Sequence, residues 1–429
     1  RATKPPWTVA VYRRGTSPRA HSPPTEEPTP NVNAWQAAAR TRASPARASP
    51  ARPRACRGRR DPWYAVGAVA ALRVLHVSDR LSQRGGADVY LLALADRQAT
   101  RHRVDIAIGR EDGTARAPCR VHRVPALASA GPAPARAALD AVARAVRPDV
   151  VHVHNVVNPD ALAWAADRGA VMTVQDHRAF CPGRGKWRAD GAVCRDAMAP
   201  DVCAGCFDDP HYFARIGAIT AARLAHVRRM ARAIVLSEYM RAELAAAGVP
   251  RDRIEVVPPF VWGIDPAAPA THPPCVLVPG RLVAAKGVWD AVDAWRRSGV
   301  RWPLVAAGTG RERAALEAAG VRVLGWVPHA DMAGVYRSAR VVVFAPRWQE
   351  PFGIAGLEAL WCGVPVAAWE SGGVRQWHPG PLAPWGDVDA LAALIAALDG
   401  TRPSPPRVPA DEAALLDRLD AIYAAAAGR

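Results

Sequence analysis

Two glutamates, Glu350 and Glu358, stand eight positions apart around Pro351 and Gly353, directly after the β-branched run 341–344. Because proline suits the first turn of a helix but not its interior, we predict that Glu350 lies in a loop and Glu358 in the following helix. The start of such a helix carries free N–H groups and a partial positive charge, which favour phosphate binding. The spacing therefore predicts an anion site with one acid on each side, although an isolated pair of glutamates is more often an ordinary helix start.

The chain around these glutamates alternates between apolar, strand-like runs and helical segments. The runs cover residues 72–77, 104–108, 121–124, 150–153, 170–174, 233–236, 254–257, 276–278, 304–307, 321–324, 341–344 and 364–367. This alternation predicts an α/β fold with doubly wound, parallel, Rossmann-like sheets. Ligands of such sheets bind outside the carboxyl ends of the strands, and Gln175, Asp176 and His177 directly follow one of the runs.

A stretch with six prolines, 258–274, divides the alternating pattern and is typical of an interdomain linker. The predicted order is a disordered, basic Arg/Pro/Ala-rich tail (1–70), a first Rossmann-like domain (71–262) with a cysteine-containing insertion (181–206), a linker (263–274), a second Rossmann-like domain (275–408) and a C-terminal helix (409–429) that could pack back on the first domain. Two such domains predict a cleft between them, which is the default active site.

The charge of the chain is concentrated in its first part. Residues 1–70 hold 13 Lys and Arg against three acids, which accounts for +10 of the net charge of +17. The predicted domains contain no basic stripe interleaved with aromatic residues, so we expect no nucleic-acid partner. A nucleic-acid-binding or zinc-scaffold protein built on the tail, with the tail as a functional basic arm, is the alternative from a different class.

No apolar run reaches the roughly 18 residues that a membrane span needs. We therefore predict a cytoplasmic protein and leave open a peripheral contact with the inner face of a membrane. The sequence makes no prediction of the oligomeric state.

Four cysteines, Cys181, Cys194, Cys203 and Cys206, fall within 26 residues and end in a Cys-x-x-Cys pair. Four thiolates can hold a tetrahedral structural zinc, although the first spacing is not that of a standard zinc finger. Unpaired or redox-linked cysteines are the alternative. No other metal site is predicted.

A set of motifs extends in one consistent order over about residues 72–400. It comprises Gly85-Gly86-Ala87, Val151-His152-Val153-His154, Gly280-Arg281-Leu282 with Lys286-Gly287, Gly325-Trp326-Val327-Pro328, and Glu350-Pro351-Phe352-Gly353 through Glu358. Together these motifs resemble the retaining glycosyltransferases of family 4, which have the GT-B fold. The resemblance implies transfer of a sugar from a nucleotide donor, a UDP- or GDP-sugar, to a glycan of the cell envelope, a lipid-linked or a natural-product acceptor. It implies no required metal or cofactor.

The resemblance also implies roles for individual residues. A departing nucleoside diphosphate develops negative charge, which Arg281 and Lys286 would bind. The first domain is then the acceptor side and the second the donor side. The remaining implied donor contacts are the backbone of Gly86, the Gly308 turn, the backbone of Val327 at the nucleobase, the N–H groups of Gly353, Ile354 and Ala355, the ribose-binding Glu358, and Glu350 near the transferred sugar.

One position departs from the family pattern. Family members commonly carry a His-Asp pair after the run 170–174, whereas this chain has Gln175-Asp176-His177. Either the amide of Gln175 contacts the sugar, or His177 reaches in from a displaced turn; we favour Asp176 and His177, with Glu350, as the catalytic residues. A nucleotide-sugar epimerase with the same fold is the alternative within enzymes.

Overall fold

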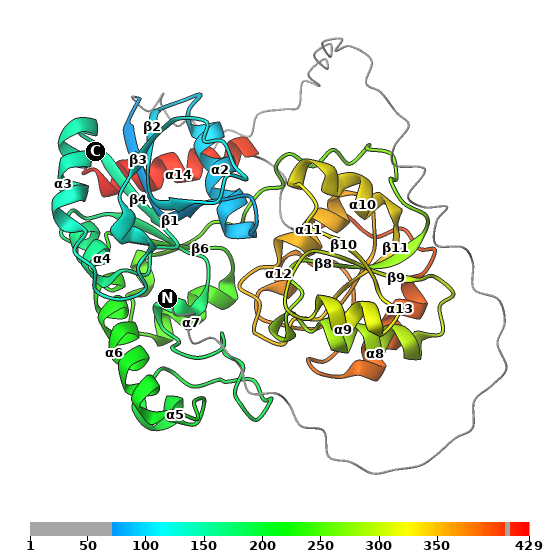
Figure 1. The fold of residues 1–429 in the computed structure, drawn as a ribbon. Coiled ribbons are helices and arrows are strands. Elements are labelled where there is room, and N and C mark those ends of the chain that lie inside the picture. The colour runs from blue at the N-terminus through cyan, green and yellow to red at the C-terminus, as the bar shows by residue number, and fades with distance from the viewer. Residues whose placement is uncertain (1–70, 408–411, 429) are drawn as a thin grey trace, which may run out of the picture. The chain divides into compact units, whose positions relative to one another are not determined.

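The computed structural model describes residues 71–407 and 412–428 (Figure 1). The predicted disordered tail, residues 1–70, lies outside the described residues. The described residues belong to one compact unit by their contacts, so the two sheets described below belong to the same unit.

The first sheet has seven parallel strands in the order β3-β2-β1-β4-β5-β6-β7. Its strands are β1 (Arg73–Leu81), β2 (Arg103–Glu111), β3 (Arg120–Arg123), β4 (Val150–His154), β5 (Val171–Val174), β6 (Arg232–Val235) and β7 (Ile254–Val256). The central strands β1, β4 and β5 are almost entirely buried because a parallel sheet is covered on both faces.

The second sheet has five parallel strands in the order β10-β9-β8-β11-β12. Its strands are β8 (Cys275–Pro279), β9 (Leu304–Ala307), β10 (Arg322–Gly325), β11 (Ala339–Phe344) and β12 (Val366–Ala368). The two sheets together confirm the predicted doubly wound α/β class.

Helices separate most strands, as parallel pairing requires. They are α2 (Gly86–Gln98), α3 (Arg136–Val146), α4 (Pro159–Ala166), α5 (Pro200–Ala204), α6 (Pro210–Val227), α7 (Glu238–Ala246), α8 (Val288–Ser298), α9 (Arg313–Ala318), α10 (Met332–Ser338), α11 (Ile354–Trp361), α12 (Val374–Trp377), α13 (Val388–Leu398) and α14 (Glu412–Ala426). Short 3-10 helices are η1 (Pro125–Ala128), η2 (His177–Ala179), η3 (Arg251–Arg253), η4 (Ala284–Lys286) and η5 (His329–Asp331). Among the described helices, none is long and apolar enough to span a bilayer.

The C-terminal helix α14 returns to the first sheet, next to β1 and β4 (Figure 1). The Tyr423 hydroxyl hydrogen-bonds to Nδ1 of His152 at 2.6 Å and accepts from Nε2 of Gln98 at 3.0 Å. Asp420 bonds to Nε2 of His102 at 2.9 Å. Buried polar contacts at both residues therefore fix the register of this helix on the sheet.

Candidate active site

Glu350 and Lys286 meet at the end of β11. The Nζ of Lys286 donates to Oε2 of Glu350 at 2.8 Å, and Nε1 of Trp348 donates to the same oxygen at 2.7 Å. Gly287 permits this approach, because its φ is 63° and a Cβ there would lie 1.6 Å from the carbonyl oxygen of Ala345. The structure therefore brings together two residues that the sequence singled out separately.

Arg281 also lies near the same indole. Its Cζ is 5.5 Å from the centroid of the Trp348 ring, and the Nζ of Lys286 is 4.5 Å from that centroid. Gly308, at the end of β9, packs so closely on the Gly280 turn that a Cβ would lie 1.8 Å from the Gly280 oxygen. The carboxyl ends of β8, β9 and β11 thus form one group with two cations.

The N-terminus of α11 lies beside this group. Gly353 occupies its N-cap position in the left-handed region (φ 98°), and no side chain caps the helix. Phe344 connects the two features: its ring lies 5.9 Å from the Nζ of Lys286 and would lie 3.0 Å from a Cβ at Gly353. The N–H groups that open a helix have no acceptors within it, and those of Ile354 and Ala355 are at the start of α11. This geometry fits the predicted anion site.

Glu358 occupies α11, as predicted, and Glu350 the preceding loop. However, α11 begins at Ile354, so Pro351 lies outside the helix rather than in its first turn. The Tyr336 hydroxyl donates to Oε2 of Glu358 at 2.8 Å, and Nε2 of His329 lies 2.9 Å from Oε1. Trp262 stacks on the His329 ring at 5.9 Å between centroids.

The predicted catalytic residues Asp176 and His177 form hydrogen bonds with different partners. Asp176 accepts from the backbone N–H of Arg178 at 2.9 Å and from its Nε at 2.7 Å, which caps η2. His177 bonds to the Tyr239 hydroxyl through Nε2 at 3.0 Å. Burial lowers the pKa of His177 to about 4, against the opposing charges of Asp176 and Glu350. His177 is therefore neutral and lies within electrostatic reach of Glu350, whereas Asp176 serves Arg178.

Residues that follow strands of the first sheet touch the Glu350 loop. The backbone N–H of Gln349 donates to the Gly185 oxygen at 3.0 Å, and the Ser237 hydroxyl donates to the Pro351 oxygen at 2.6 Å. A Cβ at Gly86 would lie 3.6 Å from Cδ1 of Ile354, so the glycine-rich turn approaches the start of α11. Val327, after β10, is partly buried against the core of this region.

Several buried polar atoms near the strand ends lack a hydrogen-bond partner among the described residues. They are Oδ1 of Asp79, both amide atoms of Gln175, Nδ1 of His177 and Nε2 of Gln349. Buried polar groups are nearly always paired, so unpaired ones that gather at strand ends indicate a place where a ligand or water binds.

The cysteine loop does not form a metal centre in the described structure. A Cβ at Gly183 would lie 3.8 Å from Sγ of Cys206 and 3.9 Å from Sγ of Cys181, so these two sulfurs flank one backbone position. Within residues 71–407 and 412–428, however, the group with ligand atoms all within 4.8 Å of one another is formed by histidines alone. The prediction of zinc at Cys181, Cys194, Cys203 and Cys206 therefore has no geometric support, and these cysteines are unpaired.

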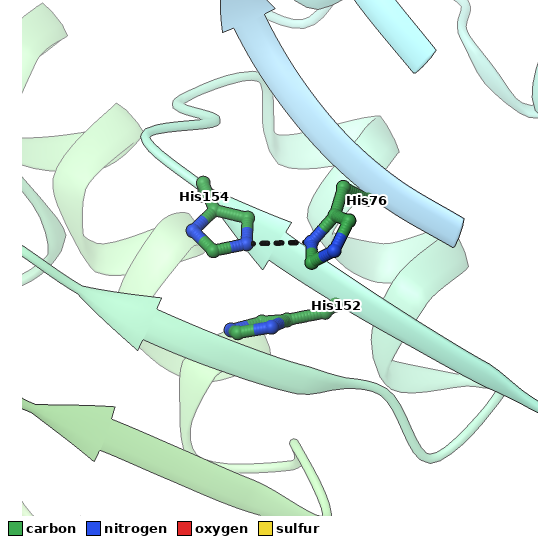
Figure 2. Close-up of side chains that lie close together, drawn as sticks. All are labelled: His76, His152 and His154. Atoms are coloured by element: carbon green, nitrogen blue, oxygen red, sulfur yellow. Dashed lines mark hydrogen bonds between the residues drawn. The ribbon is translucent and has the colours of Figure 1, made fainter. Parts of the chain in front are cut away.

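That histidine group comprises His76, His152 and His154, which are fully buried on β1 and β4 (Figure 2). Their ring nitrogens are mostly used inside the protein. Nδ1 of His76 bonds to Nε2 of His154 at 3.0 Å and its Nε2 bonds to Gln98 at 2.8 Å, while His152 bonds to Tyr423 and to Thr173. Because a metal would have to displace these bonds, the group is a polar network of the core.

The sequence did not single out several of these groups. Trp348, His329 and Tyr336 contact the two predicted glutamates from neighbouring segments of the chain. Trp348 lies only two residues before Glu350. An indole N–H so close in the sequence to a candidate acid could have indicated the hydrogen bond between them. His329 and Tyr336 could not be found in this way, because only the folding of η5 and α10 onto α11 brings them to Glu358.

With two Rossmann-like sheets and a cationic, glycine-bordered site at the strand ends, the chain has the architecture of a nucleotide-binding transferase. A family model described as "Glycosyl transferases group 1" matches residues 273–399, and one described as "Glycosyltransferase Family 4" matches residues 84–262. The chain belongs to glycosyltransferase family 4, which confirms the resemblance found in the sequence.

Known proteins agree with this assignment. A 2-deoxystreptamine N-acetyl-D-glucosaminyltransferase of Streptomyces fradiae is 29% identical over 293 residues, which are 60% of this chain and 65% of the relative. The match therefore spans less than two thirds of that curated relative. The crystal structure of HepE from Anabaena in complex with UDP-glucose is 17% identical with a TM-score of 0.56, and the match covers 83% of this chain and 93% of HepE. Sucrose-phosphate synthase from Thermosynechococcus elongatus is 18% identical with a TM-score of 0.56, with 83% and 94% covered. These structures confirm the GT-B fold.

Proposed function

We propose that the protein transfers a glycosyl group from a nucleoside diphosphate sugar to an acceptor, with retention of configuration at the anomeric carbon. The observation that carries this proposal is the convergence of Arg281 and Lys286 on Trp348, beside the open N-terminus of α11. Fixed cations and N–H dipoles stabilise the charge that develops on a departing diphosphate, and they require no reorganisation during the reaction.

The donor occupies the carboxyl ends of β8, β9 and β11 in this proposal. Arg281, Lys286 and the N–H groups of Gly353, Ile354 and Ala355 bind the diphosphate. Glu358 accepts the ribose hydroxyls, and the backbone at Val327 contacts the nucleobase. Gly308 and Gly86 let the backbone approach the donor closely, and the close packing of Gly308 on the Gly280 turn supports this for Gly308.

The transferred sugar lies near Glu350 and His177. Support for His177 comes from its unpaired Nδ1 and its electrostatic proximity to Glu350. Asp176 acts through the turn that it caps, because its carboxylate is engaged by Arg178. Glu350 holds Lys286 through one oxygen and keeps the other for a sugar hydroxyl.

We infer a UDP-sugar as the donor, with a GDP-sugar as the alternative, because HepE of the same fold has been crystallised with UDP-glucose. Ligands that bind only the native state raise the melting temperature. A thermal-shift screen of UDP-, GDP- and dTDP-sugars should therefore give its largest shift with UDP-sugars, and a shift with GDP-sugars alone would reassign the base.

The acceptor proposed is a glycan such as a cell-envelope polysaccharide, a lipid-linked sugar or a small natural product. The relative from Streptomyces fradiae is named for the small molecule 2-deoxystreptamine, which supports including small natural products among the proposed acceptors. Release of nucleoside diphosphate only when acceptor is present, with a product heavier by one sugar in mass spectrometry, supports transfer. Conversion of the donor without acceptor would instead support an epimerase. Cell fractionation tests the proposed cytoplasmic location and the contact with a membrane.

A further inference from the structure

Both carboxylate oxygens of Glu358 are held by side chains from neighbouring elements. Nε2 of His329 in η5 lies 2.9 Å from Oε1, and the Tyr336 hydroxyl of α10 donates to Oε2 at 2.8 Å. Because a carboxylate only accepts hydrogen bonds, Nε2 of His329 carries a proton and donates as well. Two carboxylate oxygens offer about four acceptor sites, so these two bonds fix the direction of the carboxylate and leave acceptor sites for a ligand.

The two donors differ in their surroundings. Tyr336 is 1% exposed and belongs to the hydrophobic core, where α10 lies beside α11 (Figure 1). Burial, together with the charge of Glu358, raises the pKa of Tyr336 well above 10, so this hydroxyl stays protonated. The His329 side chain is 13% exposed and lies between β10 and α10, two residues after Val327. His329 can therefore be replaced without opening the core, whereas Tyr336 cannot.

The imidazole of His329 is itself oriented by the chain at Trp262 and Gly263. The Trp262 ring stacks on it with 5.9 Å between centroids and 10° between planes. A Cβ at Gly263 would lie 3.6 Å from Nδ1 of His329, so the backbone also follows the edge of the ring. On either side of this pair, Val261 packs against the hydrophobic core and Ile264 belongs to it. Contacts therefore connect the proline-rich segment 258–274 to Glu358 through one histidine.

Stability alone does not explain why this position is a histidine. A phenylalanine would stack on Trp262 as an aromatic ring and would avoid the cost of desolvating a polar one. What the imidazole adds is an N–H directed at Oε1 of Glu358. That N–H reaches the acid to which we assign the ribose hydroxyls.

We infer that His329, oriented by Trp262, is a positioning residue that fixes the carboxylate of Glu358 for the ribose hydroxyls of the donor. The inference rests on the proposed function and adds two residues to it. A carboxylate that is already oriented loses little side-chain freedom when the nucleotide binds, so the pair strengthens nucleotide binding. Because His329 acts through Glu358, its effect falls on the affinity for the ribonucleotide and not on the chemical step.

The test uses His329→Phe, which keeps an aromatic ring beside Trp262 and removes the N–H. Calorimetry with UDP and GDP, each compared with its 2′-deoxy form, measures the nucleotide affinity. The Kd of the ribonucleotide that binds the wild-type protein should rise roughly 5- to 20-fold in the variant, while its preference over the 2′-deoxy form shrinks about 3- to 10-fold. With donor at saturation, kcat should stay within about twofold, since a residue that supports binding alone changes KM and not kcat.

Two further variants separate the N–H from the stack. His329→Gln places an amide N–H near the position of Nε2 and should recover part of the affinity and of the ribose preference. Trp262→Leu keeps the imidazole but removes the ring that orients it, and should raise the Kd about 2- to 5-fold. His211→Phe, at an exposed position of α6, is the control and should change neither quantity.

Three outcomes overturn the inference. They are an unchanged Kd in His329→Phe, an equal loss for the ribonucleotide and its 2′-deoxy form, and a fall in kcat without a change in KM. If His329→Phe does not fold, Trp262→Leu decides, and an unchanged ribose preference in that variant would overturn the inference. None of these results removes the proposed function, which fails separately if the wild-type protein binds neither nucleotide or transfers no sugar to any acceptor.

Discussion

The Nζ of Lys286 lies 2.8 Å from Oε2 of Glu350, although 64 residues separate them in the chain. The pair is largely shielded from water, because Glu350 is only 7% exposed. An ammonium has three donors, so Lys286 can bind Glu350 and still offer protons to a phosphate. The ion pair therefore positions the Lys286 ammonium and leaves some of its N–H donors available.

Lys286→Ala should lower kcat/KM by about 100-fold or more, because a preorganised charge that stabilises the leaving group is lost. Steady-state kinetics measure the loss of kcat/KM, and calorimetry with a nucleoside diphosphate measures the loss of affinity for the leaving group. Arg297→Ala is the matched control, since Arg297 is an exposed cation of α8 that pairs with Asp389. Equal activity of the two variants would contradict a role for Lys286 at the diphosphate.

Glu358→Gln should weaken binding of the nucleoside diphosphate by roughly 10- to 100-fold, since hydrogen bonds to a charged group contribute about 1.5–3 kcal/mol. The carboxylate already accepts from Tyr336 and contacts His329, so it is held with little freedom to reorient. Isothermal calorimetry measures the affinity. The control is Glu317→Gln, an exposed acid of α9 paired with Arg313. Wild-type affinity in Glu358→Gln would exclude the ribose contact.

Much of this fold could be predicted because buried parallel strands are short, nearly continuous β-branched runs. All twelve observed strands coincide with predicted runs. The boundaries were less accurate where polar residues lie in a strand: the predicted run ends at residue 77, whereas β1 continues to Leu81, because Ser78, Arg80 and Leu81 remain paired with β2.

The site was predicted less completely, because pairing across the fold has no signal in the local sequence. Glu350 and Lys286 were both identified, but not that they form an ion pair. Asp176 and His177 were treated as one pair, whereas the turn sends Asp176 to Arg178 and His177 to Tyr239. Both amide atoms of Gln175 are unpaired because Arg223 and Asp176 form their hydrogen bonds with other groups, and only the folded structure determines this.

Gly353→Ala should reduce both stability and nucleotide affinity. A Cβ would lie 3.0 Å from the Phe344 ring and 3.3 Å from the Trp377 ring, at a φ of 98° that L-residues rarely adopt. We expect a loss of roughly 1–3 kcal/mol in the free energy of unfolding, from strain and crowding together. Gly386→Ala is the control: its φ is 85° and no atom lies within 4 Å, so it reports the backbone strain alone. An identical loss in both variants would show that the start of α11 accommodates a side chain, and would contradict a closely packed anion site there.

The buried histidines should make the stability of the protein fall as the pH decreases. Burial lowers the pKa of His76 from 6.5 to about 4, and those of His152 and His154 well below 6.5. The groups that face these rings are Gln98 and Tyr90 from α2, Thr173 from β5 and Tyr423 from α14; Gln98, Thr173 and Tyr423 are uncharged hydrogen-bond partners, and Tyr90 is a nearby uncharged ring.

The unfolded chain binds these protons near pH 6.5 and the native state does not. The stabilisation is therefore fully present above pH 6.5 and is lost as the pH falls toward 4, at about 1.4 kcal/mol per pH unit for each such histidine. Urea unfolding between pH 7.5 and pH 4.5 measures the slope. His76→Gln should make the slope shallower by up to one proton, whereas His211→Gln, at an exposed position of α6, should leave it unchanged. A stability that stays constant over this range would mean that the network accepts protons in the native state, and that the three rings are not held neutral between β1, β4 and α14.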